Sequence, residues 1–344
     1  MYRFDCDYCE GAHPKVLQKW VETNMEQHPG YGNDDHCARA REMIKEACKA
    51  PNAQVHFLVG GTQANTVAIA AALRPHQGVI AADSGHINVH ETGAIEATGH
   101  KVLAIPTEDG KLDSKKVEEL CRLHYGDDGR EHTVQPKMIY ISSPTEFGGI
   151  YTRKELEQLG AICDAYGLYL FLDGARLAYG LTAEGNDLDL PALAQLCDIF
   201  YLGGTKVGAY FGEALVVSNP ELQEDFRYHI KQRGGMFAKG RLLGLQFEAL
   251  MEDDLYLHIG KKPVEQAQQI KKALEEKGCH LLVESPTNQL FVVMPDLWLK
   301  KLQEKYTVAF WQKVDENHTA VRFCTSWGTK QEAVDELIQD ILAL

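Results

Sequence analysis

Two runs of residues in this chain end in side chains that could do chemistry together. The run LYLFLDGAR, residues 168–176, is apolar until Asp173, and the run DIFYLGGTKVG, residues 198–208, is apolar until a glycine pair and Lys206. A lysine amine can form an imine with the aldehyde of pyridoxal phosphate, and a carboxylate can keep the pyridine nitrogen of that cofactor protonated. The two side chains together predict a pyridoxal 5'-phosphate enzyme that acts on amino acids.

The surroundings of each residue support this interpretation. Asp173 follows five residues of nearly continuous apolar character, so its carboxylate needs a partner at the edge of the core, and a protonated pyridine nitrogen is one. A cap on the following turn is the alternative. Arg176 could pair with Asp173, or reach the phenolic oxygen of the cofactor or the carboxylate of the substrate. Apolar surroundings would lower the pKa of the Lys206 amine towards its reactive neutral form, although a surface lysine in a glycine-rich loop is the alternative.

A glycine-rich loop, GGTQAN at residues 60–65, offers a place for a phosphate group. Glycines let the backbone approach a phosphate closely, and the start of a helix offers unpaired N–H groups at the positive end of its dipole. The loop lacks the Gly-Lys-Ser/Thr ending of a P-loop and the third glycine of a dinucleotide-binding fingerprint. We expect the phosphate of the cofactor here, and a tight turn without a ligand is the alternative.

Alternating strands and helices must position these groups. Continuous apolar strands between helices indicate a mainly parallel sheet covered on both faces, and ligands of such sheets bind beyond the carboxyl ends of the strands. The loops GGTQAN, SSPTEF, DGAR and GGTK all follow predicted strands, so we expect them to meet at one edge. The predicted helices span residues 14–25, 35–50, 62–73, 89–99, 114–125 with Ser114 as N-cap, 152–167 and 190–197.

The pattern changes after about Phe247. A long polar helical stretch over residues 256–278 leads to four short strand candidates and a final helix from Gln331. This order indicates a smaller α+β domain, packed against the first because no flexible linker separates them. We therefore expect three parts, which are an arm at residues 1–30, a large α/β domain at 31–248 and a small α+β domain at 249–344.

Composition excludes several classes of partner. The net charge of −14 argues against a nucleic acid or an anionic membrane surface, because phosphate contacts need clustered Lys and Arg. No apolar run approaches a membrane span and the start lacks the features of a signal peptide, so we expect a cytoplasmic protein.

The chain has nine cysteines, an odd number, and we expect their thiols to be reduced rather than joined in disulfide bonds. Cys6 and Cys9 have the spacing of a redox motif, but no strand precedes them and no second pair exists, so a redox or metal role is the weaker alternative and no metal is expected.

The motifs of this chain, taken together, resemble those of a known family. The motifs YGND, GGTQAN, PTEFGGIYT, LDGAR, GGTKVG, MEDDLYL and VRFCTSW, with His86 followed by ETGA at residues 91–94, are similar to those of the threonine aldolase and phenylserine aldolase family of fold-type I pyridoxal phosphate enzymes. The resemblance runs nearly end to end. It implies the aspartate-aminotransferase-like fold, with a mainly parallel seven-stranded sheet and a smaller α+β C-terminal domain.

The resemblance also implies roles for single residues at the cofactor. Lys206 would form the imine, Asp173 would hold the ring nitrogen, and His86 would stack over the ring. The remaining cofactor contacts would come from Gly61, Thr62 and Asn65 near the phosphate, and from Arg176.

At the substrate, the resemblance implies that Arg322 clamps the carboxylate, where a bidentate guanidinium suits two oxygens, and that Arg176 assists there. Cys6 stands where the family has a serine beside that carboxylate. Glu146 stands where many threonine aldolases have a histidine that contacts the substrate hydroxyl. The base for the β-hydroxyl proton is therefore Glu146, His86 or bound water.

The function expected on this basis is cleavage of a β-hydroxy-α-amino acid, of the threonine, allo-threonine or phenylserine type, to glycine and an aldehyde. The alternatives are a β-eliminating lyase or an aminotransferase with the same cofactor, and a ligand-binding protein on the same scaffold. A nicotinamide enzyme is the weakest alternative, because the glycine pattern is wrong. The family resemblance further implies a homodimer or homotetramer with sites at the subunit interface.

Overall fold

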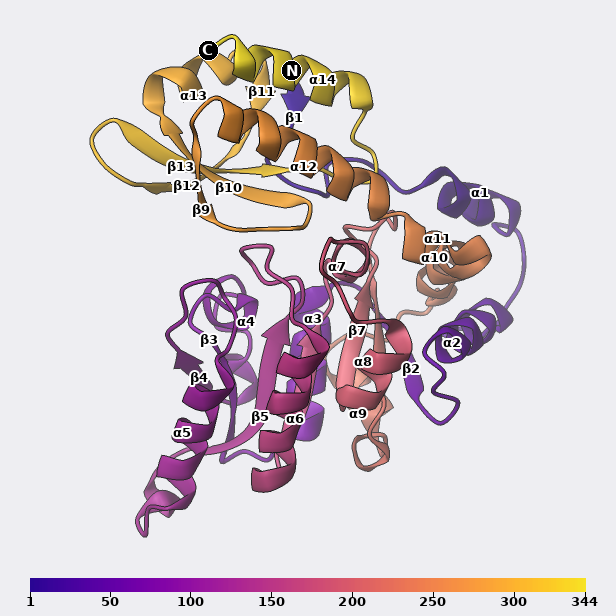
Figure 1. The fold of residues 1–344 in the computed structure, drawn as a ribbon. Helices are drawn as coiled ribbons and strands as arrows, with labels where there is room; N and C mark the ends of the chain where they lie inside the picture. The colour runs from indigo at the N-terminus through magenta and orange to yellow at the C-terminus, as the bar shows by residue number, and fades with distance from the viewer.

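The computed structural model describes residues 1–344, which form two lobes with the chain termini together on the smaller one (Figure 1). The larger lobe contains a seven-stranded sheet. All adjacent strands are parallel except at one strand, residues 213–217, which is antiparallel to both of its neighbours. The predicted mainly parallel seven-stranded sheet is therefore confirmed. Its spatial order is β2 (Gln54–Leu58), β8 (Glu213–Val217), β7 (Ile199–Gly203), β6 (Tyr169–Asp173), β5 (Gln135–Ser142), β3 (Gln77–Ala82) and β4 (Val102–Ile105).

Helices cover both faces of this sheet, which explains why its strands are apolar without interruption. Successive residues of one strand face different cores. Leu170 and Leu172 belong to one core cluster, whereas Phe171 packs in the other with Tyr140 and Tyr201. Since side chains alternate along a strand, the position after Leu172 lies on the face of the two tyrosines, which is where the chemistry is found below.

The helices of the large lobe mostly match the predicted ones. They are α2 (Asp35–Ala47), α3 (Gly61–Ala72), α4 (His86–Val89), η1 (Glu96–Thr98), α5 (Ser114–Tyr125), η2 (Arg130–His132), α6 (Arg153–Tyr166), α7 (Leu177–Leu181), α8 (Leu190–Leu196), η3 (Pro220–Leu222), α9 (Phe226–Gln232) and α10 (Arg241–Met251).

Two predictions about helices are wrong. The segment 89–99 is not a helix, because Thr92 and Gly93 have φ angles of 53° and 71°, in the left-handed region, and only η1 follows. The N-cap of α5 is Asp113 rather than Ser114, since the Asp113 carboxylate accepts a hydrogen bond from the Lys115 amide at 2.9 Å. Aspartate and serine are both good N-caps, and adjacent residues can cap the same free amides at the start of a helix; here the aspartate side chain does so.

The smaller lobe is an antiparallel sheet with helices on one side (Figure 1). The predicted helix at residues 256–278 divides at Gly260. The strands, in spatial order, are β12 (Ala309–Lys313), β13 (His318–Cys324), β10 (Gln289–Pro295) and β9 (His280–Val283). The helices of the smaller lobe are α12 (Lys261–Glu276), α13 (Asp296–Leu302) and α14 (Gln331–Leu342). The short η4 (Glu252–Asp254) and α11 (Leu255–His258) pack on α10 of the larger lobe instead (Figure 1).

The amino-terminal arm touches both lobes. Its strand β1 (Tyr2–Arg3) pairs in parallel with β11 (Tyr306–Thr307) of the smaller lobe. Its helix α1 (Pro14–Glu22) packs on α10 of the larger lobe. We retain the boundaries near residues 30 and 248 as a proposal for the division into domains. No helix of the chain is both long enough and apolar enough to cross a membrane.

Candidate active site

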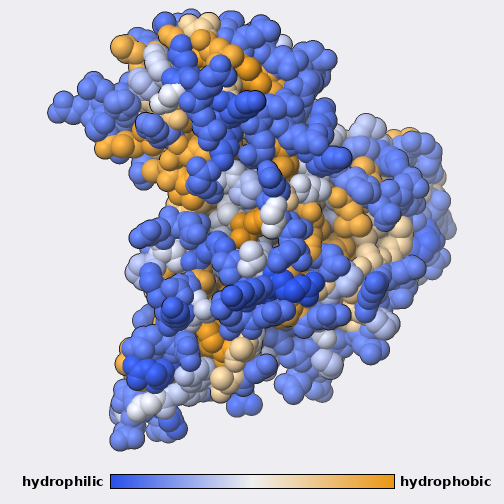
Figure 2. All heavy atoms as spheres, in the orientation of Figure 1, coloured by the Kyte–Doolittle hydropathy of each residue, from blue (hydrophilic) through white to orange (hydrophobic).

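The loops after β2, β5, β6 and β7 meet at the carboxyl edge of the large sheet. A cavity of about 280 Å³ lies there, bordered by residues of all four loops. A second cavity of about 440 Å³ adjoins it and is also lined by β10, β12 and β13 of the small lobe. Figure 2 shows the hollow between the two lobes, with apolar residues on its surface. The residues common to both cavities are Tyr8, His86, Glu146, Arg176 and Lys206.

Asp173 is buried at the end of β6 and borders the smaller cavity. Its Oδ2 accepts hydrogen bonds from the Tyr140 hydroxyl at 2.6 Å and from Asn65 Nδ2 at 3.2 Å, and its Oδ1 accepts one from the Ala175 amide at 3.0 Å. No Lys, Arg or His forms an ion pair with it. The three donors fix the orientation of a carboxylate that lacks a cationic partner in the protein.

Lys206 lies in the loop after β7 and borders both cavities. The Tyr179 hydroxyl donates to its carbonyl oxygen at 2.5 Å. Its Nζ makes no hydrogen bond or ion pair within the protein, and burial, together with the nearby Arg176 charge, lowers the pKa of the amine. Gly203 and Gly204 precede it because a Cβ there would lie 2.4 Å and 2.6 Å from backbone oxygens. The amine is therefore free of protein partners, and its pKa lies below that of an ordinary lysine.

The glycine loop before α3 lines the same cavity through Gly60, Gly61 and Thr62. Helix α3 begins at Gly61 and has no side-chain cap, so the amides of its first turn are open to a ligand. A Cβ added to Gly60 would meet no atom within 4 Å, whereas one on Gly61 would lie 3.1 Å from the Tyr201 hydroxyl. That hydroxyl is buried without a hydrogen-bond partner. This end of the cavity suits a phosphate group.

Asn65 borders neither cavity. It is buried one turn into α3, and its Nδ2 donates to Glu91 Oε1 at 2.7 Å as well as to Asp173. The same Glu91 oxygen lies 2.7 Å from Nδ1 of His86. Burial opposes protonation of His86, but the hydrogen bond to Glu91 and the charges of Asp173 and Glu91 raise its pKa. A chain of side chains thus links His86 to Asp173.

Glu146 follows β5 and borders both cavities. Its Oε1 accepts hydrogen bonds from the Ser142 hydroxyl at 2.6 Å and from the His86 amide at 2.9 Å. Burial and the charge of Asp173 raise the pKa of its carboxyl group above the usual range. A carboxylate with a raised pKa is a better proton acceptor than an ordinary one.

Arg176 pairs with Asp7 of the arm rather than with Asp173. Its Nε and Nη2 donate to the two oxygens of Asp7 at 2.6 Å and 3.0 Å, and Asn288 adds a third hydrogen bond at 2.9 Å. Burial opposes ionisation of Asp7, but the charges of Arg176 and Lys206 lower its pKa to about 2. Arg176 still borders both cavities.

Arg322 extends from β13 into the larger cavity. Its Nη2 donates to the Asp5 carbonyl at 2.7 Å and its Nη1 to Gln289 Oε1 at 3.3 Å. Its Nε and the Nε2 of Gln289 are buried without partners. Two unpaired donors on one wall of a cavity fit an anionic group.

The structure does not bring Cys6 to either cavity. Its sulfur lies beside that of Cys9 instead, and Tyr8 is the arm residue that borders both cavities. The other predicted site residues gather around one edge, as described above. Their roles stay predictions.

Four residues of the site were missed in the sequence. The apolar pattern around Tyr140 predicts a core residue of a strand, and no motif around Tyr8 indicates a functional residue. Glu91 was visible only as part of the ETGA motif. Glu213 borders the smaller cavity, where it accepts hydrogen bonds from the Gly204 amide and the Thr205 hydroxyl, and burial raises its pKa to about 7. An acid within an apolar strand was the signal that could have found it.

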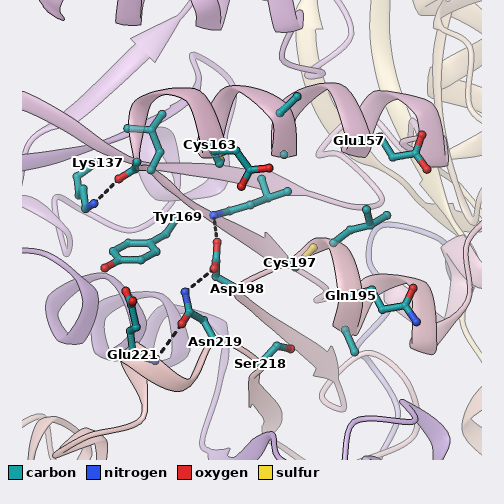
Figure 3. A pocket seen from close by; sticks show the side chains of 18 residues that line it. Lys137, Glu157, Cys163, Tyr169, Gln195, Cys197, Asp198, Ser218, Asn219 and Glu221 are labelled. Atoms are coloured by element: carbon teal, nitrogen blue, oxygen red, sulfur yellow. Dashed lines mark hydrogen bonds between the residues drawn. The ribbon is translucent and has the colours of Figure 1, made fainter.

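A larger cavity of about 650 Å³ lies at the opposite edge of the sheet (Figure 3). Three of its polar side chains, Lys137, Asp198 and Asn219, are paired with one another or with backbone. Asp198 accepts from the Leu170 amide and from Asn219, each at 2.7 Å, and Lys137 donates to the carbonyl of Gly167. Size alone therefore does not mark the site of chemistry.

The residues at the carboxyl edge fit pyridoxal 5'-phosphate. Asp173 is a buried carboxylate without a cationic partner, Lys206 is a free amine, and the loop at Gly60 leaves open space at the start of a helix. The unpaired Tyr201 hydroxyl adds a donor at the same cavity. The ring nitrogen, aldehyde carbon and phosphate of the cofactor each have a matching group.

Comparisons with known proteins agree with this site. The sequence model of the beta-eliminating lyase family matches residues 8–296. A low specificity L-threonine aldolase of Pseudomonas sp. is 30% identical over 99% of this chain and 97% of its own. The structure of Leishmania major threonine aldolase superposes with a TM-score of 0.96 at 44% identity, covering 99% of this chain and 98% of that one.

A variant of Thermus thermophilus aspartate aminotransferase shares the fold alone. It is 13% identical, with a TM-score of 0.72 over 100% of this chain and 91% of its own. The predicted aspartate-aminotransferase-like fold is therefore confirmed, and family membership confirms the predicted cofactor. The chain belongs to the beta-eliminating lyase family, together with the threonine aldolases that match it from end to end.

Proposed function

We propose that this protein is a pyridoxal 5'-phosphate-dependent aldolase that cleaves β-hydroxy-α-amino acids of the threonine, allo-threonine or phenylserine type to glycine and an aldehyde. One observation carries the proposal. The unpaired Lys206 amine and the buried Asp173 carboxylate border one cavity, and that cavity adjoins a second one lined by Arg322 and Gln289, each with one unpaired donor. The named activity of the full-length relatives supports it.

The bound cofactor supplies an electron sink for the bond that breaks. Lys206 would hold the cofactor through its amine, whose pKa is lowered by burial. Asp173, oriented by Tyr140 and Asn65, would hold a proton on the ring nitrogen. The open amides at Gly60 and Gly61 would hold the phosphate.

Arg322 orients the substrate through its carboxylate. The guanidinium is anchored by the Asp5 carbonyl and Gln289, its Nε is buried without a partner, and the residue lines the larger cavity. A substrate carboxylate held by Arg322 would be fixed from the small lobe, across the cavity from Lys206 and His86. We assign to Arg176 an electrostatic contribution at the same end, since Asp7 occupies two of its donors.

Glu146 takes the β-hydroxyl proton in this proposal. Its oxygen is held by Ser142 and by the His86 amide, and its raised pKa suits a proton acceptor. His86 is engaged with Glu91 through Nδ1, which fixes the orientation of its ring at the cavity, where it would contact the cofactor. Water on Glu146 is the remaining route for the proton.

A substrate panel tests the activity. The purified holoenzyme is incubated with threonine, allo-threonine, phenylserine, serine and alanine, and aldehyde, glycine, keto acid and ammonia are measured. Stoichiometric aldehyde and glycine from the β-hydroxy substrates are expected, with no keto acid. Ammonia and keto acid as the main products would instead establish β-elimination and refute the aldolase proposal.

We also propose a cytoplasmic homodimer or homotetramer. The supports are nine cysteines without a disulfide, and exposed apolar side chains at Tyr31, Val59, Tyr210 and Phe237. Apolar side chains in excess on a surface favour burial against a second chain. Sedimentation equilibrium of the holoenzyme would give the mass, and a monomer at micromolar concentration would contradict the proposal.

A further inference from the structure

Two thiols of the amino-terminal arm are in contact. The Sγ atoms of Cys6 and Cys9 lie 3.2 Å apart, with Cys9 exposed and Cys6 partly buried. A disulfide bond requires about 2 Å between the sulfurs, so movement of about 1 Å within the two side chains would form it. The other seven cysteines are buried, so a dissolved oxidant meets thiols only here.

The residues enclosed by these thiols belong to the site region. Asp7 is fully buried and holds Arg176 through both of its oxygens. Tyr8 borders both cavities. Just before the pair, the Asp5 carbonyl accepts the hydrogen bond from Arg322. A covalent link across residues 6–9 would therefore close the turn that connects two arginines with the cavities.

A metal ion is the competing use of the same sulfurs, since Asp5 lies with them in one cluster. The carboxylate of Asp5 is already engaged. It accepts hydrogen bonds from Arg3 at 2.7 Å and 3.2 Å and from the Thr307 hydroxyl at 2.7 Å. A structural zinc site needs four protein ligands, and the two thiols supply only two of them. The geometry therefore favours disulfide formation between the thiols over coordination of a metal ion.

We propose that Cys6 and Cys9 form a reversible oxidation site for small-molecule disulfides of the glutathione type, and that oxidation locks the turn holding Asp7 and Tyr8. One thiolate attacks the disulfide, forms a mixed disulfide and releases one thiol. The second cysteine then displaces the second thiol. One dithiol and one small disulfide thus give one protein disulfide and two small thiols, with electrons and protons balanced.

The contact between the sulfurs decides how the exchange proceeds. The second step is intramolecular and begins from thiols that already touch, so the mixed disulfide should not accumulate. Burial, the hydrogen bond with Cys6 and the charge of an ionised Cys6 raise the pKa of the Cys9 thiol to about 11. Since thiolates are the attacking species, the exchange should accelerate as the pH is raised.

Peptide mapping tests the oxidation site. Cleavage after Arg3 and Lys15 releases residues 4–15, which contain both thiols and no other cysteine. The holoenzyme is treated with glutathione disulfide, alkylated, digested and analysed by mass spectrometry. The expected peptide is unalkylated and lighter by two hydrogens, and dithiothreitol restores it to the doubly alkylated form.

The Cys9→Ser variant is the matched control, and it should retain one glutathione adduct at Cys6. A persistent adduct in the unmutated protein, an intermolecular disulfide or full alkylation of both cysteines would overturn the proposal. Stoichiometric binding of added Zn²⁺ that blocks the exchange would replace it with a metal site.

Limited proteolysis tests the locking of the turn. Tyr8 is half-exposed, and chymotrypsin cleaves after it only when the turn opens into an extended form. Oxidised protein should be cleaved after Tyr8 more slowly than reduced protein, with no difference for treated and untreated Cys9→Ser. Equal rates would refute the locking. Neither measurement uses catalysis, so both outcomes are independent of the proposed aldolase activity.

Discussion

At the carboxyl edge of the large sheet, a cavity of about 280 Å³ is bordered by Lys206, whose amine has no partner. At the opposite edge, a cavity of about 650 Å³ is bordered by Lys137, whose amine donates to the Gly167 carbonyl. The first cavity is bordered by the unpaired Lys206 amine and the unpaired Tyr201 hydroxyl, whereas the second has one buried unpaired hydroxyl, that of Ser218.

This contrast teaches that unpaired polar groups identify the site better than volume does. A buried polar atom without a partner costs free energy, and a cavity that keeps several of them is built for a ligand. At the opposite edge, burial raises the pKa values of Cys163 and Cys197, which keeps these thiols protonated and unreactive. Matched substitutions at the two edges test whether the two cavities differ in this way.

The largest effect is expected for the two lysines. Lys206→Ala should lower kcat/KM by roughly 10⁴- to 10⁶-fold, as loss of a covalent nucleophile does, and should abolish the visible absorption of the bound cofactor. Lys137→Ala should leave both unchanged. Steady-state kinetics and absorption spectra of the two variants provide the measurement. Similar losses in both would show that the edges are not distinct.

The glutamates give the next effect. Glu146→Gln should lower kcat by roughly 10²- to 10⁴-fold, since it removes a proton acceptor, whereas Glu157→Gln at the other cavity should be neutral. Because the pKa of Glu146 is raised, the activity of the unmutated enzyme should fall as the pH drops through that value. A pH–kcat profile of Glu146→Gln should lack this acidic limb. Retention of the limb would assign the proton to another group.

The aspartates should show opposite effects at the two edges. Asp173→Asn should lower kcat by roughly 10²- to 10³-fold through loss of charge at the ring nitrogen. Asp198→Asn should keep its activity but lose about 1–3 kcal/mol of unfolding free energy, because its amide would face the Leu170 amide and Asn219 without accepting from both. Kinetics and urea unfolding of both variants separate the two roles.

The smallest effect concerns the arm. The pKa of Asp7 is lowered to about 2, so its ion pair with Arg176 stabilises the fold above the ordinary pKa of an aspartate and is lost as the pH falls towards 2. Asp7→Asn should therefore cost roughly 2 kcal/mol at neutral pH, and the difference from the unmutated protein should shrink on acidification. Urea unfolding at several pH values measures it. A difference that does not change with pH would mean that packing, not charge, holds the arm.

Much of the fold and part of the site could be predicted from the sequence. Apolar strands between amphipathic helices indicate a doubly covered sheet, and all four predicted polar loops meet at its carboxyl edge. The pair Asp173 and Lys206 was also visible, because each ends an apolar strand. The helix predicted at 89–99 was wrong, because Thr92 and Gly93 have left-handed backbone angles that interrupt a helix.

Long-range pairing could not be predicted, because no local pattern encodes it. Arg176 meets Asp7 across 169 positions, and Cys6 turns to Cys9 instead of the cavity. Asn65 had the composition of a phosphate contact, yet its position one turn into α3 directs it at Asp173. These partners depend on how the arm and the small lobe pack against the large sheet.

The sequence by itself determined the strand ends, the free lysine, the buried acid and hence the cofactor, because strand periodicity and glycine positions act over a few residues. The tertiary structure decided which donors surround Asp173, which carboxylate holds Arg176 and which of two cavities does chemistry. These contacts form between side chains that are distant in the sequence and are buried together in the folded protein. A buried polar group there needs a hydrogen-bond partner or a ligand.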